Sequence, residues 1–278
     1  MQKVKDYTKF KSYLDDRVSH YPFIHDMVAF YKGLLDIWSA YPPDDLSALF
    51  KAPAAFSQTG ESEMLYLLDT ARIGDLDLTS SVYIAQDVFR LFEANMKGDK
   101  VTGCTGSSSD AVIEFIREGL SKDDKFKNGL LKWILKPSLE NTLGKLNLKT
   151  SFGKGRCPLC ASPPAMAIVF TPEKGTAEQR LLSCCFCTYR WHYSMTGCPS
   201  CCNSRPERFG LIVGDSVRDQ CVRAVSCEVC KTYLKTVFTG CRSDRKKPAE
   251  LDMDIEDVAT LNLDIMADQR GFTALCQR

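Results

Sequence analysis

The chain has 278 residues, enough for about two domains, and its hydrophobic share of 44% allows a buried core. The formal net charge of +1 gives no general attraction to nucleic acid or to an anionic membrane. No apolar run approaches the roughly 18 residues of a spanning helix, and residues 1–20 are too charged for a secretory signal. We therefore expect a cytoplasmic protein without membrane insertion, in which 14 cysteines favour metal ligation over disulfides.

The first part of the chain has helical periodicity. Apolar residues recur every three or four positions between Ile24 and Trp38, and Pro42-Pro43 is expected to end that helix. A second stripe at the same spacing lies between Val82 and Phe92. The first stripe consists of Ile24, Met27, Val28, Tyr31, Leu34, Leu35 and Trp38, and the second of Val82, Ala85, Val88, Phe89 and Phe92.

Two further helices are expected before residue 150. Gly103–Ser108 reads as a loop, after which Ser109 or Asp110 could cap a short helix carrying Val112, Ile113 and Ile116. Leu130, Leu131, Ile134 and Leu135 predict another helix, broken or bent at Pro137. These stripes indicate ordinary core packing, and nothing in residues 1–150 suggests catalysis. We predict a helical domain over residues 1–150.

The composition changes at residue 157, because 13 of the 14 cysteines lie at or beyond it. Ser151–Gly155 is typical of a linker. Beyond it, short runs rich in β-branched and aromatic residues alternate with turns and cysteines. Ala165–Phe170 and Phe209–Val213 are predicted strands.

Four Cys-x-x-Cys pairs occur in order along this second part. A turn of this spacing aims both sulfurs at one ion, and two such turns complete a tetrahedron. Eight thiolates therefore predict two metal ions, each held by four sulfurs. The pairs are Cys157/Cys160, Cys184/Cys187, Cys198/Cys201 and Cys227/Cys230.

The four pairs form an internal repeat. Cys157-Pro-x-Cys160 and Cys198-Pro-x-Cys201 share one form, with 23 residues before the next pair in one half and 25 in the other. Each half thus reads as a turn, a strand hairpin and a turn. Sequential pairing keeps these units intact, whereas interleaved pairing would break them, so we predict one module over residues 151–196 and another over 197–245.

Cysteine spacing does not distinguish zinc from iron, since four thiolates in a tetrahedron suit either metal. A closed zinc site leaves no position for a substrate, which argues against hydrolysis. Iron would make the sites rubredoxin-like and capable of one-electron redox chemistry. In either case we expect the ligand set to be essential to each module, since such small units have little core of their own.

The remaining cysteines and histidines are weaker candidates. Cys185 and Cys202 adjoin predicted ligands, but the outer members of each pair are the better ligands. Cys104 lies in a Gly-rich loop that could expose its thiol, although a buried small hydrophobe is the favoured expectation for it. His192 could replace a sulfur of the first site, although a surface position suits it better. Cys221, Cys241 and Cys276 lack partners at ligand spacing and are expected to be buried small hydrophobes.

Residues 246–278 are expected to form a closing acidic helix. Asp254 can cap a helix whose apolar face is Ile255, Val258, Leu261 and Ile265. Leu251–Asp268 contains six acidic residues and no lysine or arginine, whereas Arg205–Lys247 contains ten basic and five acidic residues. Attraction between the two segments would dock the helix on the second module, and a solvated acidic face is the alternative.

At its cysteine turns the chain resembles the FdhE family, the accessory proteins of formate dehydrogenase maturation. The four pairs in order, with their surroundings, carry the resemblance. They are Cys157-Pro-Leu-Cys160 followed by Pro163-Pro164, Arg180–Cys184 leading to Cys187 and Trp191, Cys198-x-x-Cys201, and Cys227-x-x-Cys230 before Tyr233-Leu234-Lys235. Asp257–Asp264, with Gly271-Phe272 after it, also resembles the family's closing helix. Family members usually carry glycine after the second cysteine of a turn, where this chain has Ala161, Cys202 and Lys231. We expect some backbone strain at those positions.

The resemblance implies an α+β multidomain protein with a helical N-terminal domain, two tandem rubredoxin-like or zinc-ribbon modules and a closing C-terminal helix. It also implies a cytoplasmic accessory protein, not an enzyme, which binds the formate dehydrogenase catalytic subunit before export. Two other functions remain open, a zinc-ribbon nucleic-acid binder and a rubredoxin-like electron-transfer protein. The near-neutral charge speaks against nucleic acid as a partner, and the sequence leaves the oligomeric state open, a homodimer included.

Overall fold

The structure is a computed structural model, and it describes residues 6–50, 76–95, 108–121, 125–145, 155–173, 175–214, 221–242 and 247–277. The chain divides into two compact units, Met1–Asn147 and Leu148–Arg278. The first is helical, and the second contains a mixed sheet, both four-cysteine groups and the C-terminal helices. In the described part of the chain, no helix has the length and apolar character needed to cross a membrane.

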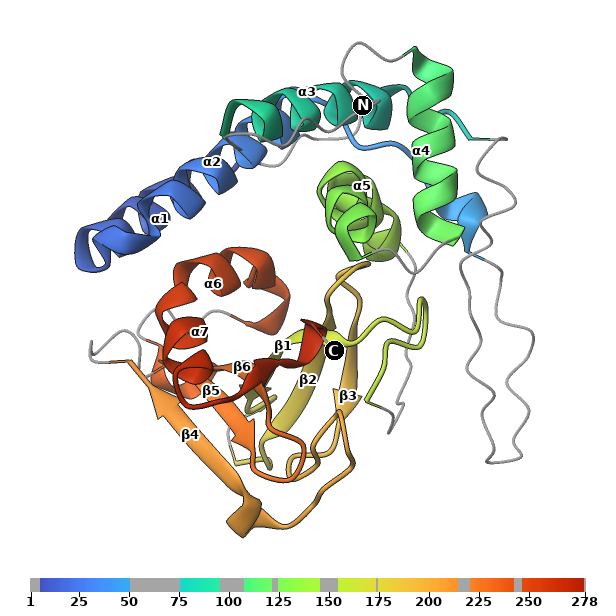
Figure 1. Cartoon of the computed structure of the whole chain (residues 1–278). Coiled ribbons are helices and arrows are strands. Elements are labelled where there is room, and N and C mark those ends of the chain that lie inside the picture. Colours follow the sequence, from blue (N-terminus) through green and yellow to red (C-terminus); the bar gives the residue numbers. More distant parts are fainter. Residues whose placement is uncertain are drawn as a thin grey trace, which may run out of the picture. The chain divides into compact units, whose positions relative to one another are not determined.

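The helices of the first unit pack through the predicted apolar stripes. α2 packs against α1 and α3, and α5 packs against α3 and α4. Figure 1 shows α1 and α2 following one another in nearly the same direction, joined by the 3₁₀ turn Pro22–Ile24. The described helices of this unit are α1 (Thr8–His20), α2 (His25–Ala40), α3 (Thr79–Asn95), α4 (Ser109–Ser121) and α5 (Lys125–Lys145).

Most residues of the two predicted stripes are buried, so the helices at Ile24–Trp38 and Val82–Phe92 are confirmed. Met27 is an exception, because 57% of its surface is exposed. The cap of α4 lies one residue earlier than predicted, since the Ser108 hydroxyl accepts from the Ala111 amide at 3.4 Å. Cys104 and its Gly-rich loop lie outside the described residues.

Of the two effects predicted for Pro137, a break or a bend, the break is wrong, because α5 continues through this residue to Lys145. Proline has no N–H, so the carbonyl of Trp133, four residues earlier, lacks its usual helical donor. The indole Nε1 of Trp38 on α2 donates to this carbonyl at 2.7 Å. A side chain from a neighbouring helix thus supplies the hydrogen bond that Pro137 removes.

The second unit is built on one sheet made from two three-strand repeats. Each repeat is antiparallel, and the repeats join where β1 and β6 pair in parallel, with Met166 opposite Lys235. The order in the described residues is β3-β2-β1-β6-β5-β4, and the short β7 adds to β6. The strands are β1 (Pro164–Phe170), β2 (Gln179–Cys184), β3 (Arg190–Tyr193), β4 (Phe209–Val213), β5 (Val222–Cys227), β6 (Thr232–Phe238) and β7 (Thr273–Ala274).

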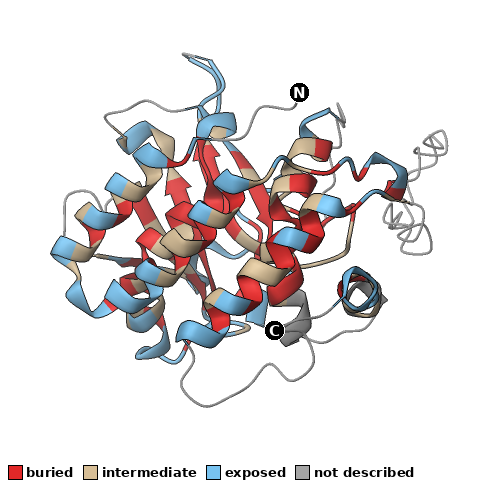
Figure 2. Ribbon diagram, turned by 90° about the horizontal axis from the view of Figure 1, so that it is seen from above, coloured by how far each residue is buried: buried red, intermediate tan, exposed pale blue. Residues whose placement is uncertain are grey.

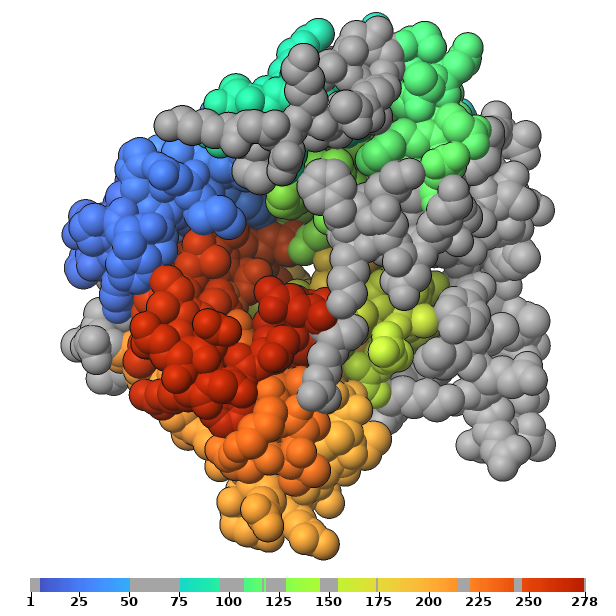
Figure 3. All heavy atoms as spheres, in the orientation of Figure 1, coloured from blue at the N-terminus to red at the C-terminus, as the bar shows by residue number. Residues whose placement is uncertain are grey.

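Strands β1 and β4 confirm the two predicted strands. Burial explains the apolar character of β1, whereas in β4 only Ile212 is buried and Leu211 is 55% exposed. Most residues of β1, β2 and β6 are buried, and Figure 2 shows the strands largely in red. One face of the sheet packs on the C-terminal helices through residues such as Ile168, Val237 and Leu263. Figure 3 shows these helices, in red, in direct contact with the orange segments of the sheet.

The C-terminal segment forms two helices in place of the single one predicted, α6 (Met253–Ala259) and α7 (Leu261–Asp268). Asp252, not Asp254, is the cap of α6, since its side chain accepts from the Ile255 amide at 3.4 Å. Asp254 lies within the first turn, where an acidic residue also suits the helix dipole. Because the chain changes direction at Thr260, the expected apolar face does not continue, and Ile265 is 45% exposed.

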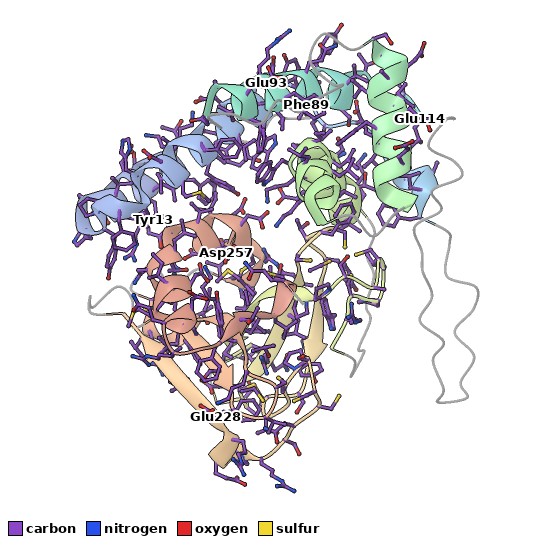
Figure 4. All side chains as sticks on the ribbon, viewed as in Figure 1. Tyr13, Phe89, Glu93, Glu114, Glu228 and Asp257 are labelled. Atoms are coloured by element: carbon purple, nitrogen blue, oxygen red, sulfur yellow. The ribbon has the colours of Figure 1, made fainter. Side chains whose placement is uncertain are left out.

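Ion pairs join these helices to the second repeat, as one of the two expectations proposed, in addition to the apolar contacts. Lys235 on β6 has a side chain only 3% exposed, and its Nζ lies 2.6 Å from carboxylate oxygens of both Asp257 and Asp264. The Tyr233 hydroxyl donates to Asp264 at 2.7 Å, and Arg242 pairs with Glu256 at 2.8 Å. Figure 4 labels Asp257, one of the two acidic partners of Lys235. The acidic segment is therefore tied by polar contacts to Lys235 and Tyr233 on β6 and to Arg242 in the turn that follows it.

Candidate metal centres

Site one consists of Cys157, Cys160, Cys184 and Cys187. The first two lie in the turn before β1, Cys184 is the last residue of β2, and Cys187 lies in the turn between β2 and β3. The Sγ atom of Cys160 lies 3.3 Å from that of Cys184 and 3.6 Å from that of Cys187. The Sγ atom of Cys157 lies 3.5 Å from that of Cys187. The β1–β2 hairpin thus brings together two turns that are distant in sequence.

Site two repeats this arrangement with Cys198, Cys201, Cys227 and Cys230. Its first turn precedes β4, Cys227 ends β5, and Cys230 lies in the turn between β5 and β6. The Sγ of Cys198 is 3.7 Å from Cys230, and that of Cys201 is 3.8 Å from Cys227. Glu228, between two of these cysteines, marks this turn in Figure 4.

The sulfur geometry fits a tetrahedral metal ion in each group. Within a group, all four Sγ atoms lie within 4.8 Å of one another. Metal–sulfur bonds of about 2.3 Å place neighbouring sulfurs of a tetrahedron about 3.8 Å apart, close to the separations of 3.3–3.8 Å in these groups. The grouping is the one that sequential pairing predicts, and either zinc or iron fits the donors.

The backbone of each turn has a repeated geometry. The amide of the first cysteine donates to the carbonyl five residues later, from Cys157 to Ser162, Cys184 to Tyr189 and Cys198 to Asn203, at 2.8–2.9 Å. The residue after the second cysteine has a positive φ, between 54° and 62°, in all four turns. Backbone strain was expected at three of these positions, where the family usually has glycine, and Thr188 is the fourth. The residues are Ala161, Thr188, Cys202 and Lys231.

Burial opposes ionisation of most of these thiols. It raises the pKa of Cys184 and Cys187 well above the ordinary value, and it raises the pKa of Cys198 to about 12. Burial also opposes ionisation of Cys230, but hydrogen bonds from the hydroxyl and N–H of Thr232 lower its pKa to about 6. A bound cation reverses this balance by stabilising thiolates, so each group is chemically suited to a positive ion.

The two sites differ in exposure. Three cysteines of site one are buried and Cys160 is half-buried, whereas Cys201 of site two is exposed. Val229, between two ligands of site two, is 56% exposed. Site two therefore reaches the surface more fully than site one does.

The other candidates lie outside both groups. Cys185 is half-buried and Cys202 exposed, and neither belongs to a four-sulfur cluster. His192 is exposed on β3, in agreement with the surface position expected for it. Burial was predicted for Cys221, Cys241 and Cys276, but Cys221 is half-buried and the other two are exposed, so that expectation is wrong. Cys241 and Cys276 lie in the short 3₁₀ segments Thr239–Cys241 and Leu275–Gln277.

The family described as FdhE, C-terminal domain, matches residues 197–277. An FdhE homolog from Aquifex aeolicus is 26% identical over 162 residues, which cover 58% of this chain and 53% of that protein. One from Citrobacter koseri is 28% identical over 203 residues, covering 73% of this chain and 55% of the relative.

A relative from Shewanella oneidensis, also an FdhE homolog, is 34% identical over 118 residues, covering 42% of this chain and 35% of that protein. The matches therefore span between about a third and about half of these relatives' own lengths. The crystal structure of the FdhE protein from Pseudomonas aeruginosa has a similar fold. It has a TM-score of 0.56 at 17% identity and covers 98% of this chain and 95% of that one.

Proposed function

The chain belongs to the FdhE family, and from this membership we propose that it is an accessory protein of formate dehydrogenase maturation. In this role it binds the catalytic subunit of formate dehydrogenase in the cytoplasm, before that subunit is exported. The observation that carries the proposal is the pair of four-cysteine groups on one sheet, closed by the acidic helices α6 and α7.

Each four-cysteine group holds one metal ion in this proposal, with all eight paired cysteines as ligands. A bound ion ties the two turns of its group together, and an iron ion would add one-electron redox chemistry. Structural sites of this kind contribute roughly 10–16 kcal/mol of apparent binding energy to folding. Since four thiolates leave no open position on a tetrahedral ion, the proposed role is binding and not catalysis.

Recovery of the partner from cells tests this function. A tagged full-length chain is purified from its own cells grown on formate, and the captured proteins are identified by mass spectrometry. We expect the formate dehydrogenase catalytic subunit with the wild type and with Cys276→Ser, whose exposed thiol lies outside both groups. Cys157→Ser, which removes a ligand of site one, should recover less of it.

Repeated failure of the wild-type chain to capture this subunit, from cells that contain it, would contradict the proposed role. Equal capture by Cys157→Ser would mean that the chain binds this partner without needing an intact site one.

Exposure of site two favours a second candidate function, rubredoxin-like electron transfer. An electron can enter or leave a cluster most readily where a ligand reaches the surface, as Cys201 does. This function requires iron. A visible thiolate-to-iron absorption band that bleaches on reduction would support it, whereas a colourless protein with two zinc ions would exclude it.

A further inference from the structure

Three residues from the half that holds site one contact the first turn of site two. We call these contacts the inter-site bridge: Arg180, Tyr193 and Gly155 against the segment Gly197–Pro199. This segment contains Cys198, a ligand of site two. All of these residues lie in the second unit, Leu148–Arg278.

Arg180 makes the most extensive of these contacts. Its Nη1 donates to the carbonyl of Gly197 at 2.9 Å and to that of Ser194 at 3.4 Å. The guanidinium also lies 5.7 Å from the centre of the Tyr193 ring. Arg180 is on β2, and the same strand ends at Cys184, a ligand of site one. One short strand thus connects a ligand of the first site with the turn that carries a ligand of the second.

Tyr193 and Gly155 fix the same segment from two other directions. The Tyr193 hydroxyl donates to the carbonyl of Cys198 at 3.1 Å. Gly155, two residues before Cys157, packs directly on the backbone of Pro199. A Cβ added to Gly155 would lie only 1.9 Å from the Pro199 carbonyl oxygen. A shift of the Cys198 turn would therefore disturb the chain on both sides of site one.

The charge of Arg180 adds an energetic link. The residue is only 7% exposed, and among the described residues its guanidinium pairs with no carboxylate. Cys198 is close enough to act on it electrostatically. A buried cation without a counter-charge is unfavourable, and four thiolates around a divalent ion carry net negative charge. A filled site two therefore stabilises Arg180 and, through it, strand β2.

We propose that the two metal sites are energetically coupled through Arg180, so that filling one site raises the affinity of the other. The inference rests on the proposed metal sites and is independent of the formate dehydrogenase partner. Coupling free energy is reciprocal, so each site must change the affinity of the other by the same factor. Couplings of this kind typically amount to about 5–150-fold.

Zinc transfer to a coloured chelator tests the coupling on the full-length protein. Cys201→Ser disables site two, and the zinc affinity of site one is then measured by competition. We expect site one to bind zinc at least about fivefold more weakly in Cys201→Ser than in the wild type. In the Arg180→Gln background, the same Cys201→Ser change should have little further effect on site one.

Arg223→Gln is the matched control, because Arg223 lies on β5 of the same sheet and stacks on Phe238, 4.7 Å from the ring centre. It should keep the wild-type coupling. If Arg180→Gln does not fold, the coupling is tested by comparing the zinc affinity of site one in the wild type and in Cys201→Ser. Equal zinc affinity of site one in these two proteins would overturn the coupling while leaving both sites in place. A wild-type protein that binds no zinc or iron would overturn the sites and the coupling together.

Discussion

At the scale of single residues, the backbone is strained at the position that follows each Cys-x-x-Cys pair. Ala161, Thr188, Cys202 and Lys231 all have the left-handed backbone conformation that glycine adopts without strain. A residue with a Cβ costs roughly 1–2 kcal/mol there. The turns keep this conformation because their hydrogen bonds require it, as from the Ala161 amide to the Cys157 carbonyl at 2.9 Å.

Substitutions at Ala161 test this strain. Ala161→Gly should leave the thermal midpoint of the metal-loaded protein unchanged or slightly higher, since relief of strain is offset by the greater freedom of glycine in the unfolded chain. Ala161→Val should lower stability by roughly 1–3 kcal/mol, because a β-branched side chain fits this conformation poorly. A valine variant as stable as the wild type would show that the position is not strained.

At the scale of elements, α5 depends on a partner from another helix. Pro137 leaves the Trp133 carbonyl without its helical donor, and Trp38 supplies one. Trp38 is almost fully buried, at 2% exposure. Sequence reasoning identified both the apolar stripe and the proline, but it could not show that the two are complementary.

A double-mutant cycle separates this hydrogen bond from packing. Trp38→Phe should reduce the free energy of unfolding by at least about 1–3 kcal/mol, because it leaves a buried carbonyl unsatisfied. Pro137→Ala restores a backbone N–H four residues after Trp133. The double variant should therefore recover part of the loss in urea unfolding. A loss in the double variant equal to or greater than that of Trp38→Phe would refute this account of α5.

The docking of α6 and α7 is a second element-scale feature, and it depends on Lys235. Lys235→Met keeps most of the side-chain volume but removes the charge that pairs with Asp257 and Asp264. We expect a loss of about 1–3 kcal/mol, and earlier cleavage of the C-terminal helices by protease. The carboxylates are partly exposed, at 41% and 28%, which limits the effect.

Lys145→Met serves as the control for Lys235. Lys145 is 48% exposed and pairs with Asp45 in the helical unit, so its loss should change stability by about 1 kcal/mol or less. If the two variants were equally stable and equally resistant to protease, the buried ion pairs would not be what docks the helices.

At the scale of the whole molecule, local patterns in the sequence predicted most of the second unit. Cysteine spacing predicted the two groups, because each turn is a short-range feature and the hairpin between turns is marked by β-rich runs. The parallel pairing of β1 with β6 was not foreseen, because it joins residues about 70 positions apart and no local signal specifies it. The proposed module limits, 151–196 and 197–245, stay predictions.

The C-terminal segment shows why helix limits are harder to predict than helix content. Asp252 and Asp254 are both plausible caps in sequence, and only the surroundings favour Asp252. Thr260 interrupts the helix, and its hydroxyl donates to the Glu256 carbonyl at 2.7 Å. A side-chain hydroxyl that competes with the backbone for a carbonyl in this way leaves little trace in the spacing of apolar residues.

Metal content per chain tests the central claim, two four-cysteine metal sites, most directly. Elemental analysis of the purified full-length protein should give two zinc or iron ions per chain in the wild type. Cys202→Ser, beside an exposed ligand but outside the groups, should also give two. Cys157→Ser and Cys227→Ser should each give about one, with faster proteolysis of the half that lost its ion. Two ions per chain in both ligand variants, or none in the wild type, would contradict the account.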